Sequence, residues 1–352
     1  MSPKTPAART RKPQMDSGRP GPARADKGEV VIQTSKLTKR FNGTITAVDG
    51  LELEIRKGEV FGLLGPNGAG KTTTISMLCT LIRPTSGKAL VAGIDVRSDP
   101  SGVRKNIGIV FQEPSVDDLL TGRENLDLHG MLYRMGPEDR KKRIVEMLDL
   151  VGLTDRADDL VRTYSGGMRR RLEIARGLMH RPKILFLDEP TLGLDPASRE
   201  HIWKYIKLLS QEQGTTMVLT THYMEEADLL CNRIGIIDNG KLIQLGTSDE
   251  LKAKVGQDIV RLRGEVDRQK LGGLKFVKKV RQDKEGSIEI TMTDAAKNLQ
   301  ALLGACGTLD SVQVREVTLN DVFLHYTGRE IHREEGEGGW GERVMQWGGQ
   351  RG

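Results

Sequence analysis

Residues 63–78 read LLGPNGAGKTTTISML, and this stretch decides the fold. An apolar run precedes a glycine-rich turn, and apolar residues at helical spacing follow it. The turn fits the pattern GxxxxGKT from Gly65 to Thr72. Glycines let backbone N–H groups wrap a phosphate chain, and the dipole of the next helix favours the same anion. The stretch therefore predicts a nucleotide site between a strand and a helix.

Each part of this turn has an expected role. Lys71 reaches the β- and γ-phosphates, and the hydroxyl of Thr72 ligates Mg²⁺. Apolar residues from Ile75 to Ile82 keep helical spacing, so we expect the helix to run on until Pro84 ends it. The residues expected to bind the nucleotide here are Gly65, Pro66, Asn67, Gly68, Ala69, Gly70, Lys71, Thr72 and Thr73.

The chain has 352 residues, enough for two domains. Over residues 30–247 short apolar strands such as EVFGLL, KILFLD and TTMVLTT alternate with helices, which is typical of parallel strands buried between helices. Over residues 250–330 the pattern changes to strands around one helix, DAAKNLQALLGAC, and predicts a small α+β domain. The boundary between these two predicted domains lies near TSDELKAKVG.

The two ends have a different composition. Residues 1–29 and 331–352 hold few large apolar side chains, so we expect both to be disordered tails. The basic first tail could touch anionic lipid or nucleic acid, but a solvated tail is favoured, and no nucleic-acid partner is expected. No signal peptide and no membrane-spanning run are expected. Three scattered cysteines show no metal spacing and indicate a reducing cytosol.

Two adjacent acids follow a buried strand at ILFLDE, residues 184–189. Ligands bind at the carboxyl ends of parallel strands, so Asp188 is expected to hold Mg²⁺. Glu189 is expected to polarise the attacking water as general base. A plain helix-capping pair is the alternative, which the preceding strand disfavours.

A second glycine pair opens a helix in TYSGGMRRRLEIARGLMHRP, residues 163–182. Ser165, Gly166 and Gly167 place free N–H groups at the start of that helix, which makes a second anion site. We interpret the RRR run at 169–171 as the helix's solvated face, with one arginine able to pair with an acid. YSGGM resembles the signature motif of ATP-binding cassette (ABC) ATPases, with methionine at the position where glutamine is commoner.

That resemblance implies a dimer in which two cassettes sandwich two ATP molecules, each signature facing the ATP of the other subunit. Gln112 in VFQEP resembles the Q-loop glutamine, which touches Mg²⁺ and the attacking water. Asp195 in LGLDP resembles the D-loop aspartate that reaches across the dimer. His222 in TTHYMEEAD resembles the switch histidine that contacts the γ-phosphate, although a lone histidine can also be structural. Phe41 resembles the aromatic that stacks on adenine; a core aromatic is its alternative.

The resemblance covers residues 30–247 and implies a P-loop NTPase cassette with a mixed sheet and a helical subdomain at about 113–165. Residues 250–330, with the ending LNDVFLHYTGRE, resemble the C-terminal extension of the daunorubicin-resistance-type exporters. In that subgroup the cassette pairs with a separate polytopic permease. The implied protein is an ATP-hydrolysing subunit that drives export, lies in the cytoplasm on the membrane's inner face and binds ATP and Mg²⁺.

Two alternatives remain open from the sequence. One is a soluble cassette ATPase of translation, repair or chromosome structure, which the single cassette and the absence of zinc motifs or heptads disfavour. The other is an ABC-type ATPase that regulates another membrane protein. The cargo and the composition of the dimer, from one kind of chain or two, leave no signal in these motifs.

Overall fold

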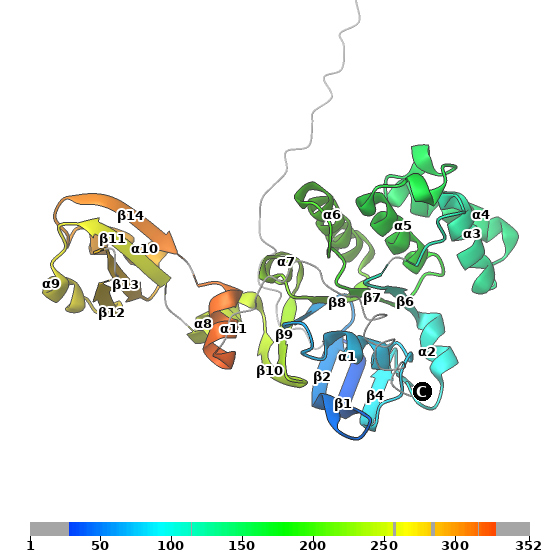
Figure 1. Ribbon diagram of the computed structural model, residues 1–352, viewed down its shortest axis with the longest axis horizontal. Coiled ribbons are helices and arrows are strands. Elements are labelled where there is room, and N and C mark those ends of the chain that lie inside the picture. The colour runs from blue at the N-terminus through cyan, green and yellow to red at the C-terminus, as the bar shows by residue number, and fades with distance from the viewer. Residues whose placement is uncertain (1–27, 114, 256–257, 283–285, 316, 329–352) are drawn as a thin grey trace, which may run out of the picture.

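The computed structural model describes residues 28–113, 115–255, 258–282, 286–315 and 317–328. Figure 1 shows a large lobe and a small one, connected through α8 (Ser248–Val255) and α11 (Leu319–Thr327). Apart from Gly28 and Glu29, the two predicted tails lie outside the described residues. None of the described helices combines the length and apolarity that crossing a bilayer would need.

A six-stranded sheet forms the centre of the large lobe. Its strand order is β10-β9-β3-β8-β7-β6; the last five strands are parallel, and β10 pairs antiparallel with β9. The mixed sheet that the family resemblance implied is therefore confirmed. The strands are β3 (Val60–Leu64), β6 (Ile107–Val110), β7 (Ile184–Asp188), β8 (Thr216–Thr221), β9 (Arg233–Asp238) and β10 (Lys241–Gly246).

Both faces of this sheet are covered, which explains its unbroken apolar runs. Along β7, Leu185 and Leu187 point into one core, whereas Ile184 and Phe186 point into the other. The first core is covered by helices α3 (Gly122–Leu132), α4 (Pro137–Leu150), α5 (Gly166–Leu178) and α6 (Pro196–Gln213). Two 3₁₀ turns, at Thr154–Arg156 and Val161–Thr163, connect α4 to α5, and α7 (Met224–Leu230) follows β8.

The second core lies under a four-stranded antiparallel sheet of order β2-β1-β4-β5. Helix α1 contacts strands of both sheets, and α2 precedes β6. These elements are β1 (Val30–Phe41), β2 (Ile45–Arg56), α1 (Lys71–Leu78), β4 (Ser86–Val91), β5 (Ile94–Asp95) and α2 (Pro100–Asn106).

The expectation that α1 runs to Pro84 is wrong, because the helix ends at Leu78. Thr80 takes a left-handed backbone (φ 64°), and its N–H donates to the carbonyl of Met77 at 3.2 Å. The N–H of Leu81 donates to the carbonyl of Ser76 at 2.8 Å. This pair of bonds is a Schellman closure, which satisfies the last helical carbonyls without glycine or proline.

The small lobe is a separate α+β unit with its own core. Its elements are β11 (Asp258–Gly264), α9 (Arg268–Gly272), β12 (Val277–Gln282), β13 (Ile288–Met292), α10 (Ala295–Leu303) and β14 (Leu309–Arg315). The order βαββαβ and the antiparallel strand order β12-β13-β11-β14 are those of the ferredoxin-like arrangement.

Packing divides the chain differently from its order in sequence. Leu251 of α8 and Phe323 of α11 are fully buried in one cluster with Leu64 and Ile236 of the central sheet. Both helices therefore pack on the large lobe, although they flank the small one in sequence. The domain boundary that the sequence suggested, at residues 247–250, would assign both helices to the small domain. Their buried side chains lie in a core of the large lobe instead.

Replacing Phe323 by alanine should destabilise the large lobe by about 3–5 kcal/mol, because a buried ring is lost and a cavity remains. The measurement is the urea midpoint of unfolding. Leu324→Ala is the matched control on the same helix, since that side chain is 38% exposed. Equal destabilisation by both changes would contradict the docking of α11.

Candidate functional site

The loop between β3 and α1 can be built only with glycine at several positions. Gly70 has φ 103° and Gly68 has φ 79°, both in the left-handed region. A Cβ atom at Gly65 would lie 2.3 Å from the carbonyl of Ile237, and one at Gly70 would lie 2.4 Å from that of Ala47. The backbone N–H groups of the loop and of the first turn of α1 can thus converge on an anion.

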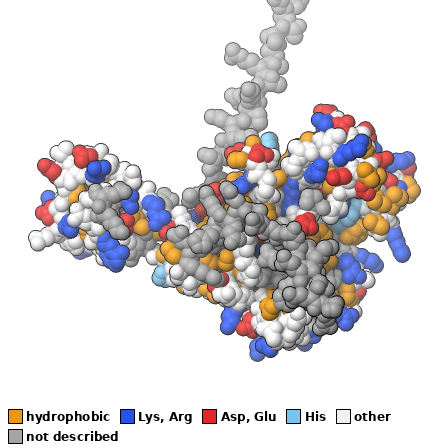
Figure 2. All heavy atoms as spheres, in the orientation of Figure 1, with side chains coloured by type: hydrophobic (Ala, Val, Ile, Leu, Met, Phe, Trp, Pro, Cys, Tyr) orange, Lys and Arg blue, Asp and Glu red, His pale blue; other side chains and the backbone are white. Residues whose placement is uncertain are grey.

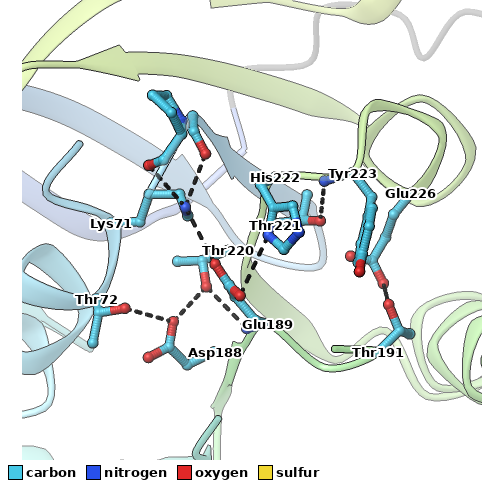
Figure 3. Close-up of polar contacts among 12 residues, drawn as sticks. Lys71, Thr72, Asp188, Glu189, Thr191, Thr220, Thr221, His222, Tyr223 and Glu226 are labelled. Carbon is cyan, nitrogen blue, oxygen red and sulfur yellow. Dashed lines mark hydrogen bonds and ion pairs between the residues drawn. The ribbon is translucent and has the colours of Figure 1, made fainter. Parts of the chain in front are cut away.

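Lys71 lies on the inner side of this loop (Figure 3). Its Nζ donates to the carbonyl of Gly65 at 2.8 Å and to that of Pro66 at 3.1 Å. The same nitrogen lies 3.2 Å from Oε1 of Glu189. Burial lowers the pKa of Lys71, and the nearby carboxylates of Glu189 and Asp188 oppose that shift. A positive charge is therefore fixed beside the loop.

Asp188 ends β7 beside two hydroxyl groups. Thr72 Oγ1 donates to Oδ1 of Asp188 at 3.2 Å, and the Thr220 hydroxyl donates to the same oxygen. Burial raises the pKa of Asp188, while the Thr220 hydrogen bond lowers it in part. A hydroxyl and a carboxylate are hard oxygen ligands, and Mg²⁺ commonly takes one or two such groups together with phosphates and water. These residues fit a nucleotide-bound magnesium ion.

Glu189 has a strained backbone and two buried partners. Its φ is 47°, unusual for a residue with a side chain, and its N–H donates to Thr220 Oγ1 at 3.0 Å. Oε2 lies 3.4 Å from Nδ1 of His222. Burial alone would raise the pKa of Glu189, but the nearby His222 imidazole and the Lys71 charge outweigh burial and lower it. The carboxylate is ionised at neutral pH and can accept a proton.

The structure thus brings Lys71, Thr72, Asp188, Glu189 and His222 together, although they come from three separate stretches of sequence. Figure 3 shows them around the carboxyl ends of β7 and β8. Parallel strands present their carboxyl ends at one edge of a sheet, which is where ligands bind in such folds.

The signature residues lie at a helix N-terminus beside α6. Ser165 caps α5, its Oγ accepting from the N–H of Met168 at 3.3 Å. A Cβ atom at Gly167 would lie 2.6 Å from Oγ of Ser198, so α5 and α6 approach closely there. Asp195 caps α6, and hydrogen bonds from Ser198 lower its pKa. Within the described residues, no hydrogen bond or ion pair joins Ser165 or Asp195 to the Lys71 cluster.

Two other predicted site residues also stay apart from that cluster. Gln112 is half-buried in the segment after β6, and Phe41 is half-buried at the end of β1. Nζ of Lys39 lies 5.0 Å from the centre of the Phe41 ring. In the described part of the chain, neither residue has a polar contact with Lys71 or Glu189.

The interpretation of residues 169–171 as a solvated face is wrong for Arg170, which is 6% exposed. Its Nη2 donates to the carbonyls of Asp188 and Glu189, each at 3.0 Å. An ion pair at 3.0 Å joins it to Glu173, one helical turn further along. That arginine–glutamate pair at i, i+3 is the sequence signal that could have identified Arg170 as buried and paired.

Glu226 and its partners were also missed from the sequence. Glu226 is fully buried on α7, and its Oε1 accepts from Thr191 Oγ1 at 2.9 Å and from Trp203 Nε1 at 3.1 Å. Burial raises the pKa of Glu226, against hydrogen bonds that lower it. Glu226 lies four residues after His222 in HYMEEAD. This helical spacing places it on the same side as the predicted site histidine and was the signal that the sequence offered.

Comparison with known proteins gives two family matches. Residues 48–192 match the ABC transporter family. Residues 246–327 match the C-terminal domain of ATP-binding proteins like DrrA1-3.

Among similar proteins, the daunorubicin/doxorubicin resistance ATP-binding protein DrrA of Streptomyces peucetius is 43% identical, over 84% of this chain and 92% of that protein. The linearmycin resistance ATP-binding protein LnrL of Bacillus subtilis is 41% identical, over 86% of this chain and 99% of that protein.

Solved structures are similar over the large lobe. One is cbiO1 of Clostridium perfringens, part of the ABC transporter complex cbiONQ, with a TM-score of 0.59 and 27% identity over 64% of this chain and 94% of that chain. Another is the dimeric ATP-binding cassette MJ0796 in a post-hydrolysis state bound to ADP and Pi. Its TM-score is 0.56 at 31% identity, over 61% of this chain and 98% of that chain.

The raised pKa of Glu226 gives a pH-dependent stability. A raised pKa means that the folded state binds the proton more tightly than the unfolded chain does. The resulting stabilisation is fully present below the ordinary glutamate value of 4.5 and is lost as pH rises through the folded pKa. Relative to Glu226→Gln, which cannot ionise, the unchanged chain should therefore become less stable across the range that begins at the ordinary glutamate value and extends upward through the raised pKa.

The urea midpoints of both proteins across that range measure this difference. Glu225→Gln, a change at the exposed neighbour on the same helix, is the matched control. An equal trend in the control, or a trend of opposite sign in Glu226→Gln, would contradict the assignment.

Proposed function

Because the chain belongs to the ABC transporter family, within the group of drug-resistance ATP-binding proteins, we propose that the Lys71–Glu189 site binds ATP with Mg²⁺ and hydrolyses the nucleotide to drive export. The protein is an ATPase that powers transport through a separate permease. The observation that carries the site assignment is the buried Glu189 carboxylate, held between Lys71 and His222 beside the glycine-rich loop.

Each residue of the cluster has a distinct role in the proposed reaction. The N–H groups from Gly65 to Thr73 bind the phosphates, and Lys71 neutralises charge on the β- and γ-phosphates. Thr72 and Asp188, with Gln112, would hold Mg²⁺, which would neutralise the phosphate charge that develops on transfer. Glu189 accepts a proton from the attacking water, and His222 fixes the γ-phosphate. Phe41 stacks on adenine.

A second copy of the chain completes each site in this proposal. Ser165 and Gly166 are exposed and Gly167 is buried at the start of α5, and this helix start can bind the γ-phosphate of ATP held by the other copy. Asp195 lies beside that helix start and reaches the same interface. The dimeric state of the similar cassette MJ0796 supports this arrangement.

The proposed membrane partner binds the surface that α3 and α4 form on the large lobe. Figure 2 shows hydrophobic side chains on this surface. Leu119, before α3, is 74% exposed, and Leu132 at the end of α3 is 72% exposed; Leu128 and Met131 of the same helix are exposed as well. A cavity of about 250 Å³, lined by residues that include Phe111 and Tyr133, lies between α3 and the segment after β6. The exposed apolar side chains of α3 suit a docked helix.

In this arrangement the chain lies on the cytoplasmic face of the membrane, held there by its permease. The similar proteins named for daunorubicin, doxorubicin and linearmycin resistance support export of a bulky antibiotic-like compound. The cassette itself touches no cargo, so cargo choice belongs to the permease.

The Glu189→Gln variant should bind ATP normally, lose turnover by about a hundredfold or more, and accumulate as an ATP-bound dimer. Its amide cannot accept the proton of the attacking water. Phosphate release, nucleotide binding and size-exclusion chromatography measure the three effects. Lys71→Ala is the companion variant and should lose ATP binding itself. Near-normal turnover by Glu189→Gln would overturn the assignment of the base.

The Leu132→Asp variant should keep its ATPase activity in isolation but lose binding to its membrane partner by roughly tenfold or more. The new charge would be buried without a partner at an apolar contact. Recovery of a polytopic protein from detergent-solubilised membranes of the source cell is the measurement. Val312→Asp, at a position 39% exposed on β14 of the small lobe, is the control. Equal recovery by both variants would place the docking surface elsewhere.

A further inference from the structure

Arg170 forms the most extensive polar contact set beneath the candidate active site. Besides the bonds to the carbonyls of Asp188 and Glu189, its Nε donates to the carbonyl of Pro190 at 2.7 Å. Nη1 donates to the carbonyl of Phe111, the residue before Gln112. One side chain therefore binds three successive carbonyls at the end of β7 and one carbonyl after β6.

Glu173 extends this network. It is fully buried and balances the Arg170 charge, and its Oε1 accepts from both the N–H and the hydroxyl of Ser115. The Arg170–Glu173 pair thus holds the chain at Phe111 and at Ser115, on either side of the segment that begins with Gln112. Both charged groups come from α5, the helix that Ser165 and the signature glycines begin.

The carbonyls that Arg170 binds belong to a strained stretch of backbone. Glu189 has φ 47°, a conformation that persists only when its surroundings fix it. Thr220 fixes the N–H side of this residue, and Arg170 fixes the carbonyl side. The direction of the Glu189 carboxylate depends on that backbone, although Arg170 touches neither the carboxylate nor the nucleotide position.

We propose that Arg170 is a positioning residue that holds Glu189 in its reactive orientation through hydrogen bonds to backbone carbonyls. The same side chain connects Glu189 to α5, the helix that the signature residues begin, and to the segment that begins with Gln112. This inference rests on the proposed function. It also gives a physical route by which movement of α5, when its N-terminus binds a nucleotide of the second copy, reaches Glu189. The neighbouring Arg171 has no such role, since it binds the carbonyls of Val151 and Gly152 instead.

The test compares Arg170→Met with Arg171→Met in the full-length chain. Each change removes an arginine of α5 that donates hydrogen bonds to backbone carbonyls elsewhere in the chain. Only Arg170→Met removes the bonds to residues 188–190. We expect Arg170→Met to lower kcat by about ten- to a hundredfold, since a displaced catalytic group costs that much, with the KM for ATP unchanged. Arg171→Met should keep its kcat.

Arg170→Met leaves Glu173 buried without its partner, which can itself destabilise the fold. The Arg170→Met/Glu173→Gln variant removes that charge and keeps an oxygen for Ser115. We expect its urea midpoint to return toward that of the unchanged chain while kcat stays low. Recovery of kcat together with the midpoint would overturn the proposal and leave Arg170 a purely structural residue.

Arg170→Lys separates charge from geometry. One ammonium cannot reach carbonyls on two segments as the planar guanidinium does, so kcat should stay low. A normal kcat in this variant would contradict positioning through several carbonyls. Failure of the proposed function would be seen separately, as normal turnover by Glu189→Gln.

Discussion

The buried ion pair between Lys71 Nζ and Glu189 Oε1, 3.2 Å apart, is the interaction on which the rest of the structure depends. The chain places two carboxylates in succession at the end of β7, where burial disfavours both charges. Removing one member of such a pair leaves an uncompensated charge, at a cost of about 3–5 kcal/mol. The fold must therefore bring a cation to this point.

Bringing Lys71 there constrains the neighbouring elements. The loop before it must turn through left-handed backbone at Gly68 and Gly70, and at Gly65 there is no room for a side chain. The remaining polar groups at the end of β7 are then satisfied from β8 by Thr220 and from α5 by Arg170. The phosphate-binding loop, α1, β7, β8 and α5 meet at this site. Its charges are balanced only when all five are in place.

The small lobe is independent of this arrangement. Its βαββαβ unit buries its own core, whereas the helices on either side of it, α8 and α11, bury theirs against the central sheet. Phe323 packs in the same cluster as Leu64, the last residue of the strand before the phosphate loop. Sequence order could not show this, because the docking of α11 is a contact between residues far apart in the chain.

The sequence alone determined the elements whose signals are local. The glycine loop, the apolar strands followed by acids, and the glycines before α5 each show their chemistry within a few residues, and so they identify the nucleotide-binding fold. The end of α1 was misplaced because its Schellman closure uses Thr80 in a left-handed conformation, which composition does not predict. Tertiary structure alone decided which charges are buried and paired. Arg169, Arg170 and Arg171 are three identical residues in the sequence. Only the packing of α5 against the end of β7 makes Arg170 the donor to three successive carbonyls there. The physical reason is that burial depends on what the fold places opposite each side chain.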